Sequence, residues 1–197
     1  MRVRIVLAAV LAALAAAAPV QAAKPGTCNG LTPTIVAEKG VPTDGTSGDD
    51  VILGTSGNDD IDGGPGNDTI CGGSGSDSIT GGEGNDTIDG GNGSDIITGD
   101  GEAAGTGGDD IISGGNGKDS IYGEGGNDQL AGDNGKDLLD GGEGNDLLDG
   151  GNGKDEMIGG AGDDAFDGGN GKDSCTTDAE DLAEPDGCDI VEASVTE

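Results

Sequence analysis

The chain of 197 residues contains no His and no Trp, and its only aromatic side chains are Tyr122 and Phe166. The absence of His excludes a Ser-His-Asp type of catalytic triad. The near absence of aromatic residues excludes a core built from large rings. Basic residues are also scarce, with 8 Lys plus Arg against 40 Asp plus Glu and a formal net charge of −32. Because polyanions repel such a chain, no nucleic-acid partner is expected, and cations are the ligands that it attracts.

The first 22 residues have the pattern of a secretory signal peptide. Arg2 and Arg4 precede an apolar run of 14 residues from Ile5 to Ala18, and Val20-Gln21-Ala22 fits the small-residue rule for cleavage after Ala22. An N-terminal membrane anchor is the alternative, but the apolar run is short for a span of about 20 residues. We therefore expect residues 1–22 to be removed, and the mature chain to be secreted and extracellular, with no membrane span.

Glycine, in contrast, is abundant: 45 residues, most of them placed in a nine-residue repeat that runs from residue 45 to residue 176. Fourteen units align once residues 99–104 (GDGEAA) are set aside as an insertion. Positions 1 and 4 are Gly and position 6 is Asp in all fourteen units. Position 8 is Ile in eight units and Leu in three, followed by Met157, Phe166 and Cys175.

Each constant position has a physical meaning. Gly at positions 1 and 4 permits positive φ angles and close backbone approach, so positions 1–6 are predicted to form a turn. Positions 7–9 are predicted to form a short strand in which the apolar position 8 faces inward and positions 7 and 9 face solvent.

Alternate units differ at positions 3 and 5, which indicates that two units make one coil of eighteen residues. The sequence thus predicts an all-β solenoid of about seven coils. Because the alternation continues after residues 99–104, this insertion is expected to bulge from one turn without interrupting the stack.

These units match the pattern GGxGxDxUx, and the chain resembles the RTX (repeats-in-toxin, haemolysin-type) calcium-binding family over residues 45–176. The resemblance implies a parallel β-roll with Ca²⁺ bound in the turns, between units i and i+2 on the same edge. It implies that backbone carbonyls and the side chains at position 6 are the ligands. On this chain those residues are Asp50, Asp59, Asp68, Asp77, Asp86, Asp95, Asp110, Asp119, Asp128, Asp137, Asp146, Asp155, Asp164 and Asp173.

The residue types favour calcium independently of the resemblance. Calcium takes six to eight oxygen ligands in flexible geometry, whereas zinc and copper prefer His or Cys, and magnesium requires stricter geometry. Six gaps between turns on each edge allow up to about twelve ions. Residues 45–176 carry 30 acidic residues and 4 Lys, a net charge of −26, around a core of one apolar side chain per unit. Folding is therefore expected to be coupled to metal binding.

The remaining segments are expected to cap the roll. In residues 23–44, the stretch 31–37 offers a capping strand with Ile35 or Val36 facing inward, and residues 177–197 carry Leu182, Ile190 and Val191 for the opposite end. Four Cys in an exported chain indicate disulfides, and their wide spacing disfavours metal ligation. We predict Cys28–Cys71 and Cys175–Cys188, because the other two connectivities must join opposite ends of a rod.

The favoured function is that of an exported, non-enzymatic calcium-binding protein that folds on binding calcium. No P-loop or EF-hand pattern is present, and residues 23–44 are too few for the catalytic or pore-forming domain that accompanies many RTX repeats. The alternative is a calcium-stabilised, adhesin-like surface module that binds an envelope or matrix partner. The sequence identifies no particular protein or glycan as that partner.

Overall fold

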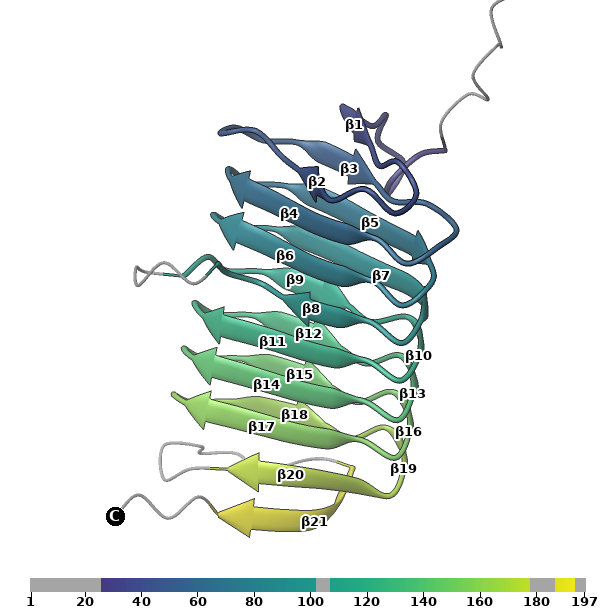
Figure 1. The fold of residues 1–197 in the computed structure, drawn as a ribbon. Coiled ribbons are helices and arrows are strands. Elements are labelled where there is room, and N and C mark those ends of the chain that lie inside the picture. The colour runs from purple at the N-terminus through teal and green to yellow at the C-terminus, as the bar shows by residue number, and fades with distance from the viewer. Residues whose placement is uncertain (1–25, 102–106, 178–186, 194–197) are drawn as a thin grey trace, which may run out of the picture.

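The computed structural model describes residues 26–101, 107–177 and 187–193. The predicted signal peptide, residues 1–22, lies outside this part of the chain. Within it all regular structure is β, and no helix there is long and apolar enough to cross a membrane. Figure 1 shows the strands stacked one above another in two sheets that face each other.

Both sheets are parallel throughout. The first contains β1 (Ile35–Val36), β3 (Val51–Leu53), β5 (Thr69–Ser74), β7 (Thr87–Gly93), β9 (Ile111–Ser113), β12 (Gln129–Ala131), β15 (Leu147–Asp149) and β18 (Ala165–Asp167). The second contains β2 (Thr43–Asp44), β4 (Asp60–Pro65), β6 (Ser78–Glu83), β8 (Ile96–Thr98), β11 (Ser120–Gly125), β14 (Leu138–Glu143), β17 (Glu156–Ala161), β20 (Asp173–Thr177) and β21 (Cys188–Ala193). Four two-residue strands continue from β7 along one edge: β10 (Asn116–Gly117), β13 (Asn134–Gly135), β16 (Asn152–Gly153) and β19 (Asn170–Gly171).

The register of the strands is the register of the repeat. Ile61 pairs with Ile79, eighteen residues later, and Ile97 pairs with Ile121, which lies one coil later across the insertion. The predicted all-β parallel β-roll is confirmed, and the flanking strands extend the seven coils of the repeats to about eight turns.

The core is a single column of side chains between the sheets. All fourteen position-8 residues, from Ile52 to Cys175, belong to one buried cluster in which the most exposed member, Phe166, has 6% of its surface accessible. Positions 7 and 9 are mostly exposed or half-buried. The predicted inward direction of position 8 is therefore confirmed.

Both ends of the column have an additional strand. At the N-terminal end β1 pairs with β3, and Ile35 packs against the core while Val36 stays half exposed. At the C-terminal end β21 pairs with β20. Leu182 lies outside the described residues.

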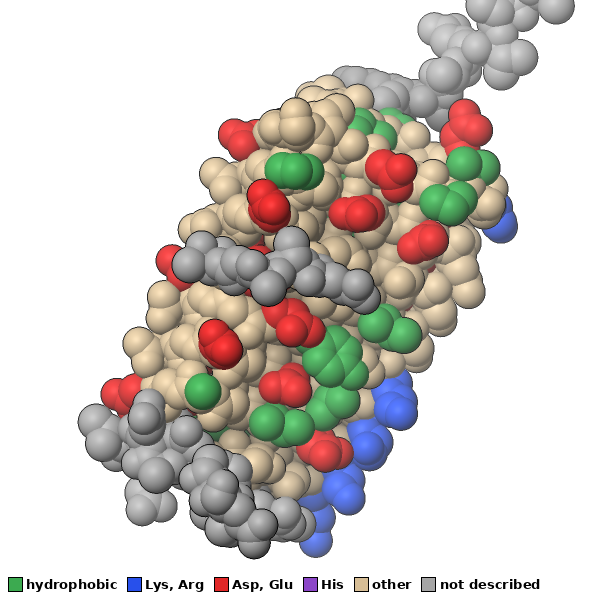
Figure 2. Space-filling model, turned by 60° about the vertical axis from the view of Figure 1, so that its left-hand side comes forward, with side chains coloured by type: hydrophobic (Ala, Val, Ile, Leu, Met, Phe, Trp, Pro, Cys, Tyr) green, Lys and Arg blue, Asp and Glu red, His purple; other side chains and the backbone are tan. Residues whose placement is uncertain are grey.

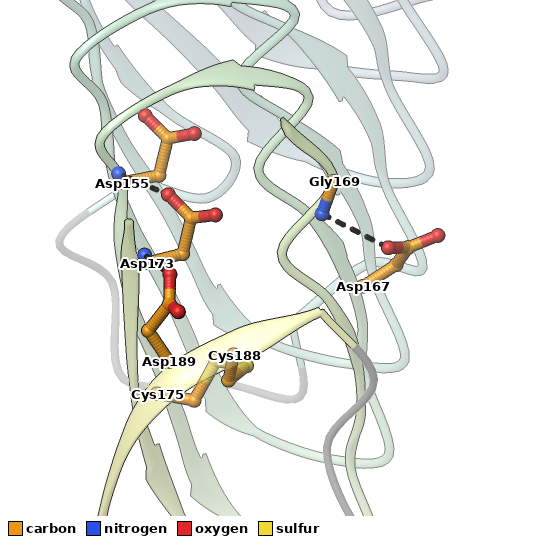
Figure 3. The surroundings of a disulfide bond; sticks show 7 residues. All are labelled: Asp155, Asp167, Gly169, Asp173, Cys175, Cys188 and Asp189. Carbon is orange, nitrogen blue, oxygen red and sulfur yellow. Dashed lines mark hydrogen bonds between the residues drawn. A yellow bond between two sulfur atoms is a disulfide. The ribbon is translucent and has the colours of Figure 1, made fainter. Parts of the chain in front are cut away.

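Disulfides attach both end segments to the roll. The predicted pairs are confirmed, with Cα–Cα distances of 5.6 Å for Cys28–Cys71 and 6.0 Å for Cys175–Cys188, the latter shown in Figure 3.

The structure places Gly99 within the repeat, whereas the sequence predicted it as the first residue of the insertion 99–104. Gly99 N–H donates to the carbonyl of Tyr122, just as the first-position Gly54 donates to Cys71 one coil later. Gly99 therefore occupies the first position of its unit, and the additional residues follow it rather than begin with it. The sequence could not distinguish these alternatives because residues 99 and 105 are both Gly.

The turns stack so closely that most have no room for a side chain. Gly117 has a φ of +147°, and a Cβ built on it would overlap the carbonyl oxygen of Gly93 in the preceding coil. Gly48 occupies the same repeat position in the first unit, where nothing lies within 4 Å of such a Cβ.

We therefore expect Gly117→Ala to destabilise the calcium-loaded protein by at least ~2 kcal/mol, because the backbone must both shift and hold an unfavourable φ. Gly48→Ala, the matched control, should stay within about 0.5 kcal/mol of wild type. Thermal unfolding followed by circular dichroism in saturating calcium measures both effects. Equal melting temperatures for the two variants would contradict the close stacking described above.

Candidate metal sites in the turns

The position-6 aspartates line the interior of the turns on both edges of the roll. All fourteen are buried, with 0–7% of their surface exposed. Successive members on one edge are hydrogen-bonded: the backbone N–H of each donates to Oδ1 of the Asp one coil later, at 2.7–2.9 Å. On one edge this ladder ends where Asp173 N–H donates to Oδ2 of Asp189, at 3.3 Å (Figure 3). The repeat motif predicts these residues only as ligands and gives no sign of this hydrogen bonding between coils.

The second carboxylate oxygen has a different environment. In eleven of these residues Oδ2 is buried and accepts no hydrogen bond: Asp68, Asp77, Asp86, Asp95, Asp110, Asp119, Asp128, Asp137, Asp146, Asp155 and Asp173. A buried carboxylate oxygen without a donor is costly, and a cation is the partner that such an oxygen lacks.

A backbone oxygen lies close to most of these carboxylates. At nine first-position glycines, a built Cβ would be no more than 3.0 Å from both Oδ2 of its own unit's Asp and the first-position carbonyl oxygen one coil later: Gly63, Gly72, Gly81, Gly90, Gly99, Gly123, Gly132, Gly141 and Gly150. Only glycine leaves these oxygens uncovered. The turns of consecutive coils therefore present a carboxylate and a carbonyl oxygen to the same space.

These oxygens fit calcium. In the described part of the chain, no three acidic or sulfur-bearing side chains converge on one point. Side chains alone therefore do not complete a coordination shell, and backbone carbonyls must supply much of it. An all-oxygen set of carboxylate and carbonyl groups suits a hard cation with flexible geometry, which describes calcium better than zinc or copper.

The first two units are built differently. Oδ2 of Asp50 accepts hydrogen bonds from the N–H and hydroxyl of Thr46, and Thr55 binds Oδ2 of Asp59 in the same way, all at 2.6–2.8 Å. The backbone hydrogen bond from Thr46 is the main reason that the pKa of Asp50 is lowered. Two of the fourteen predicted ligands thus already have donors for the oxygen that accepts no hydrogen bond in the eleven residues named above.

Burial dominates the electrostatics of the interior carboxyls. It raises the pKa of Asp86 and Asp128 to about 7, of Asp110 to about 8 and of Asp137 to about 6, although the backbone hydrogen bond to each opposes the shift. Neighbouring carboxylates in the adjacent coils raise these pKa values further. Burial, together with the charge of Asp173, also raises the pKa of Asp155, and the ammonium of Lys136 is a smaller opposing effect.

Asp100 is a further carboxylate near the turns that contain Asp86, Asp110 and Asp128, and the repeat motif did not predict it. It accepts hydrogen bonds from Gly108 N–H at 3.0 Å and Gly125 N–H at 3.2 Å, and so joins two consecutive turns. Burial raises its pKa, and its charge contributes to the raised pKa values of Asp86, Asp110 and Asp128. The only sign of this role in the sequence is that Asp100 directly follows Gly99. That sign can be interpreted only when Gly99 is known to be the first residue of a repeat unit.

Comparison with known families gives one result. A family model for the RTX calcium-binding nonapeptide repeat matches in four copies, at residues 44–79, 72–103, 104–139 and 140–175, which together cover about two thirds of the chain. No individual curated protein matches the sequence.

The raised pKa values predict how the metal-free chain responds to acid. Carboxyls such as Asp110 titrate near pH 4 in the unfolded chain but near pH 8 in the roll, so the folded state binds more protons between these values. Stability of the metal-free roll should therefore be greatest at low pH and fall as the pH rises from about 4 to about 8.

Circular dichroism of decalcified protein should accordingly show more strand at pH 5 than at pH 8. With calcium present the trend should reverse, because protons compete with the metal for the same oxygens. A strand content of the metal-free protein that increases with pH would contradict the burial of these carboxyls.

Proposed function

The chain belongs to the RTX calcium-binding nonapeptide repeat family, and from this premise we propose that it is an exported protein whose repeats fold into a β-roll when they bind calcium. The observation that carries the proposal is the set of eleven buried Oδ2 atoms that accept no hydrogen bond. Each of these carboxylates is held in place because its Oδ1 accepts the hydrogen bond from the backbone N–H of the Asp in the preceding coil. The carboxylate oxygens are thus oriented for a cation before one arrives.

Coupling between folding and binding is supported by the arrangement of charge. The charge of an aspartate in one coil raises the pKa of an aspartate in the next, as Asp68 does for Asp86, and only one apolar side chain per nine residues opposes that repulsion. Bound calcium supplies the missing positive charge inside the turns. The family's calcium chemistry and this thin core together favour a chain that is unfolded without metal.

We assign the ligand role to the twelve aspartates from Asp68 to Asp173. Asp50 and Asp59 are proposed instead to close the N-terminal end, since Thr46 and Thr55 already satisfy their Oδ2 atoms. We propose that the calcium-loaded roll binds up to about twelve ions.

Export is supported by two features. Residues 1–22 have the signal-peptide pattern described above, and the two disulfides indicate that the protein matures in an oxidising compartment. Within the described residues we find no constellation that supports catalysis, and we propose a binding protein rather than an enzyme.

The central prediction is that calcium gates folding. At pH 7.5 the mature chain in chelator should give a coil spectrum, and addition of calcium should produce the strand signal cooperatively. Magnesium at the same concentration should be much less effective, because it demands stricter geometry and releases its water reluctantly. A full strand signal in chelator would refute the coupling.

A single ligand substitution tests the geometry of the sites. Asp119→Asn keeps Oδ1 as an acceptor for the N–H of Asp95 but removes the charge next to Gly114. Because consecutive turns on one edge share ions, we expect the calcium concentration at the midpoint of folding to rise several-fold. The calcium-induced folding transition should also become less cooperative. Asp60→Asn, an exposed residue with the same change in charge, is the control and should leave the midpoint within about twofold. Calorimetry that shows the loss of one independent site and no change elsewhere would exclude shared ligation.

A further inference from the structure

A row of lysines lies along one edge of the C-terminal half of the roll. Lys118, Lys136, Lys154 and Lys172 occupy position 5 of four turns that are in register, as the pairing of β10, β13, β16 and β19 shows. All four side chains are exposed, and Figure 2 shows Lys side chains in a line on this edge. Strand spacing puts neighbours in the row about 4.8 Å apart at their backbones.

A second row runs beside the lysines. The side-chain amides of Asn92, Asn116, Asn134, Asn152 and Asn170 form a chain of hydrogen bonds, each Nδ2 donating to Oδ1 of the preceding Asn at 3.0–3.2 Å. These bonds fix the amides in one orientation. Each amide between two others keeps one N–H and one oxygen lone pair for an outside partner. We call the eight exposed residues of the four turns the basic edge: Asn116, Lys118, Asn134, Lys136, Asn152, Lys154, Asn170 and Lys172.

The turn itself does not require lysine. In the coils before the row, position 5 is Asn58, Ser76 and Ser94, and the side chain of each accepts the backbone N–H of the same position one coil later. Lysine has no acceptor and cannot continue this ladder. A column of like charges in register also destabilises a sheet. Lysine therefore replaces residues that serve the fold better, which points to a role outside folding.

Charge is separated between the two edges of these coils. The opposite edge exposes Asp109, Glu124, Glu143 and Asp163. On the four turns of the basic edge, all of which are described, Asp133 is the only carboxylate that is not buried, and it accepts a hydrogen bond from the Ser113 hydroxyl. None of the four lysines forms an ion pair within the described part of the chain. Their ammonium groups are thus available to an external anion.

We propose that the basic edge binds a linear polyanionic glycan, with one acidic sugar per coil. The ammonium groups would pair with carboxylates or sulfates, and the fixed amides would exchange hydrogen bonds with sugar hydroxyls. An extended polysaccharide advances by a similar distance per sugar as the roll does per coil, so the two repeats can stay in step. Single-stranded nucleic acid fits this edge less well, because no aromatic side chain is present on it for a base to stack on.

The proposal rests on the proposed function, because calcium must order the coils before the lysines align. Calcium also lowers the net charge of −26 on residues 45–176, which otherwise repels an anionic polymer. Binding to the glycan therefore depends on calcium, although the lysine and asparagine side chains of the basic edge are not among its proposed ligands.

The test uses dextran sulfate as the probe and uncharged dextran as its control, at saturating calcium. Wild type should bind dextran sulfate, lose this binding in chelator and ignore dextran. K136S/K154S should weaken binding roughly tenfold, since each exposed ion pair contributes a few-fold. K24S/K39S removes the same number of lysines from the sequence before the repeats and should change affinity by less than twofold. Serine is chosen because Ser76 and Ser94 occupy the same position within this chain, and calcium-induced circular dichroism confirms that each variant folds.

Three results would overturn the proposal. Equal weakening by K136S/K154S and K24S/K39S would show that net charge, not the row, governs binding. Equal affinity for polyglutamate of matched charge density would show an anion site without glycan preference. If the calcium-folded wild type did not bind dextran sulfate, the glycan proposal would be refuted and the calcium-dependent fold would stand. If the chain did not fold with calcium, the proposed function itself would be refuted.

Discussion

The structure depends on the carboxylate at position 6 of each repeat. In twelve of the fourteen repeats one of its oxygens accepts a backbone N–H from the preceding coil, and in eleven of these the other is buried without a donor. The first interaction holds coils together and the second makes the same stack unfavourable unless a cation is present. A single side chain thus combines the structural link between coils with their dependence on metal at neutral pH.

Glycine makes this arrangement possible because it has no side chain, so the backbones of consecutive turns can approach closely. The apolar column contributes one residue per unit, so the remaining contacts between coils are backbone hydrogen bonds and the aspartate ladders. A fold of this kind has few alternative packings, because every coil repeats the contacts of the previous one. Its stability is a sum over neighbours, and changes in one turn affect mainly the coils on either side.

The sequence was sufficient for the architecture because the architecture is periodic. The eighteen-residue coil, the inward direction of residues such as Ile88 and both disulfides follow from the spacing of the residues. The place of the insertion did not follow, since Gly99 and Gly105 are chemically identical and only backbone pairing separates them. The threonines that donate hydrogen bonds to Asp50 and Asp59 were not predicted, because position 2 varies along the chain. The hydrogen bonds between aspartates of successive coils were not predicted either, because a motif specifies residue types but not which oxygen accepts from which N–H.

The aspartate ladder also has a direction. In every pair the N–H belongs to the earlier coil and the accepting carboxylate to the later one, up to Asp173 and Asp189. A coil that forms before its C-terminal neighbour therefore has an unsatisfied N–H until that neighbour stacks on it. Closure of the roll is therefore ordered along the chain: each later coil completes its predecessor, and strand β21, which carries Asp189, completes the last turn of that edge.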